Sequence, residues 1–161
     1  MRVRRGTAAV ILGAALLLAG GAARAETATC DIPIIHALPG GSNGPQIDPK
    51  IDRLRSYFSQ PPFTAWHDFK LLDRKTLTLQ ENQPVQFEMP NSRPATITFL
   101  GHTPGPGEHR MRLRLWIDHP EKHHRTIDTT FVLDEGGVVL HVGQKHEGGV
   151  LILAVSCKTR D

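Results

Sequence analysis

The second half of the chain alternates between apolar and polar residues. Between residues 110 and 118 the apolar positions are Met111, Leu113, Leu115 and Ile117, and the positions between them are Arg110, Arg112, Arg114 and Trp116. Successive side chains of a β-strand point to opposite faces of its sheet, so this spacing predicts a strand with one buried and one solvent-facing side. The segments 94–101 and 126–134 repeat the pattern. Together these segments predict an antiparallel sheet.

Further strands are predicted wherever short apolar or alternating runs lie between turn residues. A first strand is expected at 29–38, and after residue 63 we expect strands at 66–72, 75–80, 84–89, 94–101, 110–118, 126–134, 137–142 and 149–157. The run 150–155 is apolar at every position, which predicts a central strand that is buried on both faces. The expected fold is mostly β (α+β), an antiparallel β-sandwich or curled sheet of about eight short strands.

One amphipathic helix is predicted near the N-terminus of this fold. Asp48 is a favourable N-cap, and Pro49 suits the first helical position. The apolar residues that follow at helical spacing are Ile51, Leu54, Tyr57 and Phe58. The sequence Gln60-Pro61-Pro62 ends the helix. We expect this helix to pack on an edge or end of the sheet.

The first 25 residues have the three parts of a cleaved signal peptide. Arginines at positions 2, 4 and 5 precede an apolar stretch at 8–19, and Ala23-Arg24-Ala25 is a cleavage sequence. We therefore expect residues 26–161 to form a single disulfide-closed, β-rich domain in the periplasm or outside the cell. An uncleaved N-terminal anchor is the alternative. No second apolar run follows, so no transmembrane segment is expected after cleavage.

Removal of the signal peptide changes the charge of the chain. Four of the 19 basic residues and none of the 16 acidic residues lie in it, so the remaining chain has a formal charge of −1. A nucleic-acid-binding protein needs a basic surface to neutralise phosphates. Nucleic acid is therefore not an expected partner.

The two cysteines lie near the two ends of the predicted mature chain. Export brings Cys30 and Cys157 into an oxidising compartment, which predicts a disulfide between them. The chain-entropy model assigns about 5 kcal/mol to closing so long a loop. The alternative is that Cys30 carries a lipid, but Thr27-Ala28-Thr29 does not resemble the residues that precede a lipidated cysteine.

Nine histidines suggest a metal as an alternative function. Neutral imidazole binds Zn and Cu well, and the candidate ligands are His119, His123, His124, His141 and His146. The densest group lies in a predicted turn, and no His-Glu-x-x-His motif is present. A solvated polar loop explains the same residues, so no cofactor is expected under the main hypothesis.

A second pair, His102 and His109, brackets a Pro- and Gly-rich loop. If Phe99 lies opposite Met111, the two histidines point to opposite faces of the sheet. Proximity in the hairpin is then not enough to make them ligands of one metal.

The row formed by Arg110, Arg112, Arg114 and Trp116 is the candidate ligand-binding site. Guanidinium groups beside an aromatic ring suit an anionic glycan, lipid head group or peptide. A solvated face is the alternative, because pairing of Ile117 with Ile127 brings Trp116 opposite Asp128 and Arg110 opposite Asp134.

Catalysis finds little support in the sequence. There is no Gly-x-Ser-x-Gly motif, and the carboxylate pairs available to a hydrolase are Asp68 with Asp73 and Asp134 with Glu135. The expected function is therefore an exported binding or structural module of the cell envelope, with an envelope protein or glycan as partner. A Zn- or Cu-binding envelope protein is the alternative, and an exported hydrolase is the third. The sequence does not determine the oligomeric state.

Overall fold

The computed structural model describes residues 26–41, 44–103, 110–119 and 125–159. The strands among these residues are β1 (Thr27–Leu38), β2 (Gln46–Ile47), β3 (Asp68–Gln80), β4 (Pro84–Glu88), β5 (Pro94–His102), β6 (Arg110–Asp118), β7 (Arg125–Asp134), β8 (Val139–His146) and β9 (Gly149–Thr159). The helical segments are η1 (Pro49–Leu54), α1 (Arg55–Phe58) and η2 (Phe63–Ala65). The predicted signal peptide at 1–25 lies outside the described residues. In the part that is described, no helix is long and apolar enough to cross a membrane.

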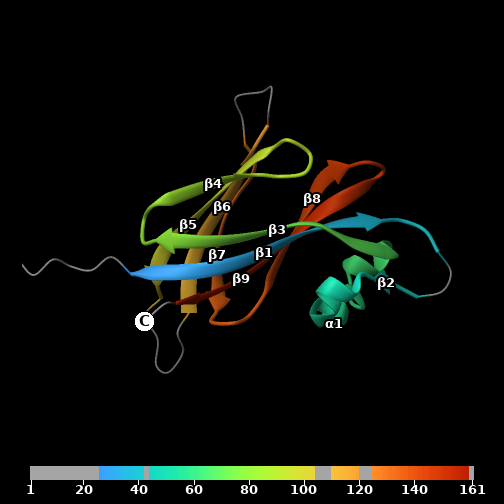
Figure 1. The fold of residues 1–161 in the computed structure, drawn as a ribbon, viewed down its shortest axis with the longest axis horizontal. Coiled ribbons are helices and arrows are strands. Elements are labelled where there is room, and N and C mark those ends of the chain that lie inside the picture. Colours follow the sequence, from blue (N-terminus) through green and yellow to red (C-terminus); the bar gives the residue numbers. More distant parts are fainter. Residues whose placement is uncertain (1–25, 42–43, 104–109, 120–124, 160–161) are drawn as a thin grey trace, which may run out of the picture.

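The strands form two sheets. Sheet A has the order β2-β3-β1-β9-β8, and sheet B has the order β4-β5-β6-β7. All neighbours are antiparallel except β2 and β3, which are parallel. In Figure 1, β1 (blue) runs between β3 (green) and β9 (dark red). The predicted mostly β class is confirmed.

One apolar core joins the two sheets. Ile32 and Ile34 of β1 and Leu153 of β9 meet Ile97 of β5 and Leu113 of β6 there. In β6 the odd-numbered residues enter this core, as the alternation predicts. The shared core is in keeping with the expected sandwich.

A second core covers the opposite face of sheet A. Ile35 of β1, Phe69 of β3 and Ile152 of β9 pack there against Leu54 and Phe58 of the helical segments. The rings of Phe58 and Phe69 are stacked with centroids 4.1 Å apart. Figure 1 shows the helix at the end of sheet A where β2 lies. The central strands of sheet A are therefore buried on both faces, as predicted for the apolar run 150–155.

The predicted helix is present but differs in place and type. It follows β1 and β2 and is not N-terminal, and its first part is a 3-10 helix. Asp48 does cap it, since its side chain accepts a hydrogen bond from the Lys50 N–H at 2.9 Å. Ile51 has non-helical backbone angles, which separates the first turn from the rest. As a result Tyr57 is 38% exposed and not part of the apolar face.

The strand boundaries are close to those predicted, with one merger and one addition. The predicted segments 66–72 and 75–80 merge into a single strand, β3, which begins only at Asp68, and Leu72 is an extra residue in its pairing with β1. Such a bulge admits one unpaired residue without ending the strand. The two-residue strand β2 was not predicted.

The predicted disulfide is confirmed. Cys30 of β1 and Cys157 of β9 are directly opposite each other in sheet A, with a Cα–Cα distance of 4.0 Å. Both side chains are buried in the core between the sheets. The bond joins two strands that are 127 residues apart in sequence.

Candidate functional site

The outer face of sheet B carries the predicted arginine row. The even-numbered side chains of β6 are exposed or half-buried, whereas the odd-numbered ones are buried. Each row member faces a residue of β7, with Trp116 opposite Asp128, Arg114 opposite Thr130, Arg112 opposite Val132 and Arg110 opposite Asp134. The cross-strand partners predicted for Trp116 and Arg110 are therefore confirmed. We call this surface the arginine face.

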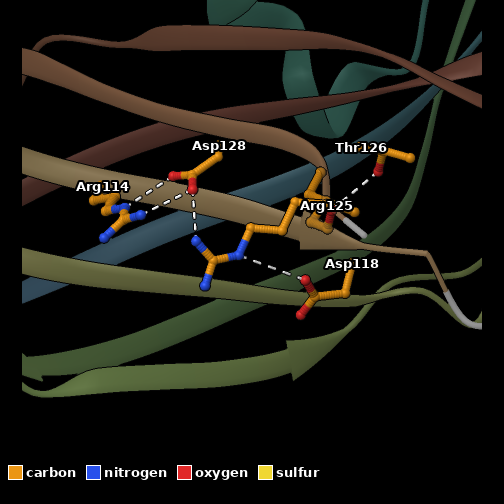
Figure 2. Close-up of polar contacts among 6 residues, drawn as sticks. Arg114, Asp118, Arg125, Thr126 and Asp128 are labelled. Atoms are coloured by element: carbon orange, nitrogen blue, oxygen red, sulfur yellow. Dashed lines mark hydrogen bonds and ion pairs between the residues drawn. The ribbon is translucent and has the colours of Figure 1, made fainter. Parts of the chain in front are cut away.

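Asp128 is the centre of an ion-pair network on the arginine face (Figure 2). Arg114 donates to both of its carboxylate oxygens at 2.8 and 2.8 Å, and Nη1 of Arg125 donates to Oδ2 at 2.6 Å. Nε of Arg125 also lies 3.8 Å from Oδ1 of Asp118. The hydrogen bonds from Arg114 and then Arg125 hold the pKa of Asp128 well below its usual range, and Asp128 raises the pKa of Arg114.

Trp116 lies beside this network. The guanidinium carbons of Arg114 and Arg125 are 5.4 Å and 5.0 Å from the centroid of its ring. These distances are within the range of cation–π contacts. The half-buried indole therefore contacts both guanidinium groups, of which that of Arg125 belongs to an exposed residue.

Arg110 and Arg112 differ in how their charges are compensated. Nε of Arg110 donates to Oδ1 of Asp134 at 3.0 Å. Arg112 is exposed and faces Val132, and within the described residues it has no carboxylate partner. The arginine face thus combines compensated pairs with one cation whose charge is available to a ligand.

The candidate metal ligands are not brought together where the structure describes them. His119 follows β6, whereas His141 and His146 lie in β8 of the other sheet. No group of three metal-binding side chains occurs in the described ranges. His123 and His124 lie outside these ranges, so the metal-binding alternative stays an untested prediction.

His141 has an unusual environment at the rim where the two sheets meet. Its ring packs edge-on against Phe131 of β7, with centroids 4.6 Å apart. Its Nε2 is buried and has no hydrogen-bond partner among the described residues. Burial lowers the pKa of His141 to about 4, so the ring is neutral at pH 7.

The register predicted for His102 was wrong. Phe99 pairs with Leu113 and not with Met111, and His102 is the residue opposite Met111. The cause is an irregularity after Phe99, where Gly101 has a φ of +91° that side chains rarely adopt. Nδ1 of His102 lies 2.9 Å from a carboxylate oxygen of Glu26. His109 lies outside the described residues.

The carboxylate pairs considered for a hydrolase are engaged with cations or backbone. Asp68 lies 3.1 Å from Nζ of Lys70, and Asp73 lies 2.8 Å from Nζ of Lys75. The hydrogen bond from Lys75 lowers the pKa of Asp73. A general acid needs the opposite shift.

Hollows around Trp66 were not predicted from the sequence. One, of about 450 Å³, lies between Trp66 and the β8–β9 turn. Another, of about 350 Å³, is lined by Trp66, His67 and Phe58. Nε2 of His67 is buried there, and no described residue forms a hydrogen bond with it. Their walls come from segments distant in sequence, so no local pattern marks them.

Comparison with known proteins gives no relative from which a function can be transferred. No family model, curated protein or solved structure matches this chain.

Proposed function

We propose that this protein is an exported, non-catalytic binding module of the cell envelope and that the arginine face binds an acidic glycan. The predicted signal peptide supports export, and the disulfide between Cys30 and Cys157 is weakly consistent with it. The observation that carries the choice of surface is Trp116, which is held in an ordered Arg–Asp network and lies four residues along β6 from Arg112, on the same face of the sheet.

The chemistry of the arginine face suits a sugar that carries carboxylates. Sugar hydroxyls both donate and accept hydrogen bonds, and the arginine–aspartate pairs present donors and acceptors side by side. Because these side chains are already held by one another, binding orders fewer of them. Arg112 supplies the cation for a carboxylate, and the indole of Trp116 supplies apolar surface for a sugar ring.

The proposal is tested by calorimetric titration of the exported protein with a uronic-acid oligosaccharide and with a neutral oligosaccharide of the same length. We expect the acidic sugar to bind more tightly. Replacing Arg112 with Gln should weaken its binding about tenfold, the size of one charge-assisted hydrogen bond. Trp116→Leu should also weaken it.

Arg55→Gln is the matched control, because Arg55 is an exposed arginine on the helical side of sheet A. It should bind like the unaltered protein. Equal affinity for the acidic and the neutral sugar, or unchanged binding by both Arg112→Gln and Trp116→Leu, would overturn the proposal.

A further inference from the structure

A separate hollow of about 420 Å³ lies at the rim between the two sheets. Arg93 enters it from the β4–β5 turn, Thr126 and Ile127 from β7, and Gln144 and Lys145 from β8. In Figure 2, Thr126 lies apart from the network around Asp128. The hollow is therefore distinct from the arginine face.

Arg93 is held in this hollow by a neutral group. Its Nη1 donates to Oε1 of Gln144 at 2.7 Å, and its carbonyl accepts a hydrogen bond from Met89 at 3.0 Å. The Gln144 side chain has no charge, so this contact fixes the guanidinium without neutralising it. The other N–H groups of the guanidinium remain for a ligand, since Arg has five donors in a fixed plane.

A bulge in β8 makes this arrangement possible. The register shifts between Val142 and Gln144, and Gly143 between them has a φ of +127°. Without the extra residue Gln144 would point to the same face as Val142, toward the helical segments. With it, Gln144 faces the space between the sheets, where it is 4% exposed and meets Arg93. Bulges commonly redirect a side chain in this way.

The hollow has a positive charge that the described residues do not compensate. Arg93 and Lys145 both line it, and neither has an ion pair with a carboxylate in the described part of the chain. Among the described residues that line the hollow, none is acidic. The hydroxyl of Thr126 donates to the carbonyl of Ile117 at 3.0 Å, which leaves its oxygen to accept a further hydrogen bond.

We propose that this hollow binds a small ligand through an oxyanion, a carboxylate or a phosphate. Arg93 binds the oxyanion through its free N–H groups, and Lys145, whose side chain starts from the other face of the edge strand β8, raises the positive potential at the edge of the hollow. The oxygen of Thr126 accepts a hydrogen bond from a hydroxyl of the ligand. The volume lies in the range of small-molecule sites, and a monosaccharide-sized ligand fits it.

The test uses NMR titration of the exported protein with glucose 6-phosphate, glucuronate and glucose, which share a ring and differ in charge. We expect the amide signals of Thr126, Gly143 and Lys145 to shift with one or both anions and not with glucose. Binding of only the phosphate or only the carboxylate identifies the oxyanion and supports the proposal.

Two variants and one control locate the ligand. Arg93→Gln should weaken anion binding at least tenfold. Lys145→Gln should weaken it severalfold, and because Lys145 is exposed this variant leaves the fold intact. Arg55→Gln, on the helical side of sheet A, should leave the shifts of the Thr126, Gly143 and Lys145 amides unchanged. Because these three amides line the hollow and not the arginine face, they report on this site separately from the one proposed above. Equal shifts with glucose, no shifts with either anion at 10 mM, or unchanged binding by Lys145→Gln together with Arg93→Gln would overturn the proposal.

Discussion

Strand β9 of sheet A and strand β6 of sheet B have the same antiparallel geometry but different surroundings. From Leu151 to Cys157 every residue of β9 is buried, whereas β6 buries only alternate residues. The helical segments account for the difference, because they cover the face of sheet A that lies away from sheet B. Stability is therefore concentrated in sheet A, and the outer face of sheet B has side chains that can serve binding at little cost to the fold.

The largest expected effect comes from removing the covering of sheet A. Phe58 is 1% exposed and stacks on Phe69, so Phe58→Ala should lower the free energy of unfolding by about 3–5 kcal/mol. The measurement is urea-induced unfolding followed by circular dichroism.

The control is on the outer face of sheet B. Val132 is 38% exposed there, and Val132→Ala should change the free energy of unfolding by less than about 0.5 kcal/mol. Similar losses for the two variants would contradict the contrast between the sheets.

Loss of the disulfide within sheet A should have a slightly smaller effect on stability. Replacing both Cys30 and Cys157 with Ala should lower the free energy of unfolding by about 2–5 kcal/mol, because the bond restricts the unfolded chain between two distant strands. The unfolding midpoint in urea, compared with and without a reductant, measures it. The double variant should no longer respond to the reductant, and a persistent response would show that the reductant acts elsewhere.

The smallest effect concerns the rim between the sheets and depends on pH. The folded protein keeps His141 neutral down to a pH of about 4, whereas the unfolded chain takes up the proton near the usual pKa of 6.5. The contribution of His141 to the free energy of unfolding is fully present above pH 6.5. It decreases by on the order of 1–3 kcal/mol as the pH falls toward 4. His141→Leu should therefore lose less stability between pH 7 and pH 4 than the unaltered protein. Parallel losses in the two proteins would show that His141 is not the group that titrates.

Sequence patterns predicted sheet B more completely than the rest of the molecule. In β6 and β7 one face is buried and one is wet, so the alternation fixes the register, and Ile117 does lie opposite Ile127. Alternation does not predict the register beyond a bulge. One extra residue at Leu72, Gly101 or Gly143 changes the pairing of all the residues that follow it. The type of the helix was also predicted wrongly. A 3-10 helix has about three residues per turn and an α-helix has about 3.6, and over two turns the apolar spacing hardly distinguishes them.

The two candidate sites differ in the same way in how far the sequence predicts them. The arginine face was predictable because its members are two residues apart on one strand and their partners follow from register. The hollow at Arg93 was not, because Arg93, Thr126 and Lys145 belong to three separate segments and meet only through the packing of one sheet on the other. Gly143, which directs Gln144 toward Arg93, has no signal in the sequence beyond a glycine in a strand.

The pairing of β1 with β9 also constrains how the chain reaches its native state. β1 is synthesised well before β9, since Cys30 and Cys157 are 127 residues apart in sequence, yet the two strands are neighbours in sheet A. Sheet A therefore cannot close before β9 has been synthesised, and until then β3 is the sheet neighbour of β1 that is present. Contacts between such distant segments slow folding. In the emerging chain, sheet B is the part whose strands all pair with their neighbours in sequence, so it is able to form first and serve as the surface on which sheet A is completed.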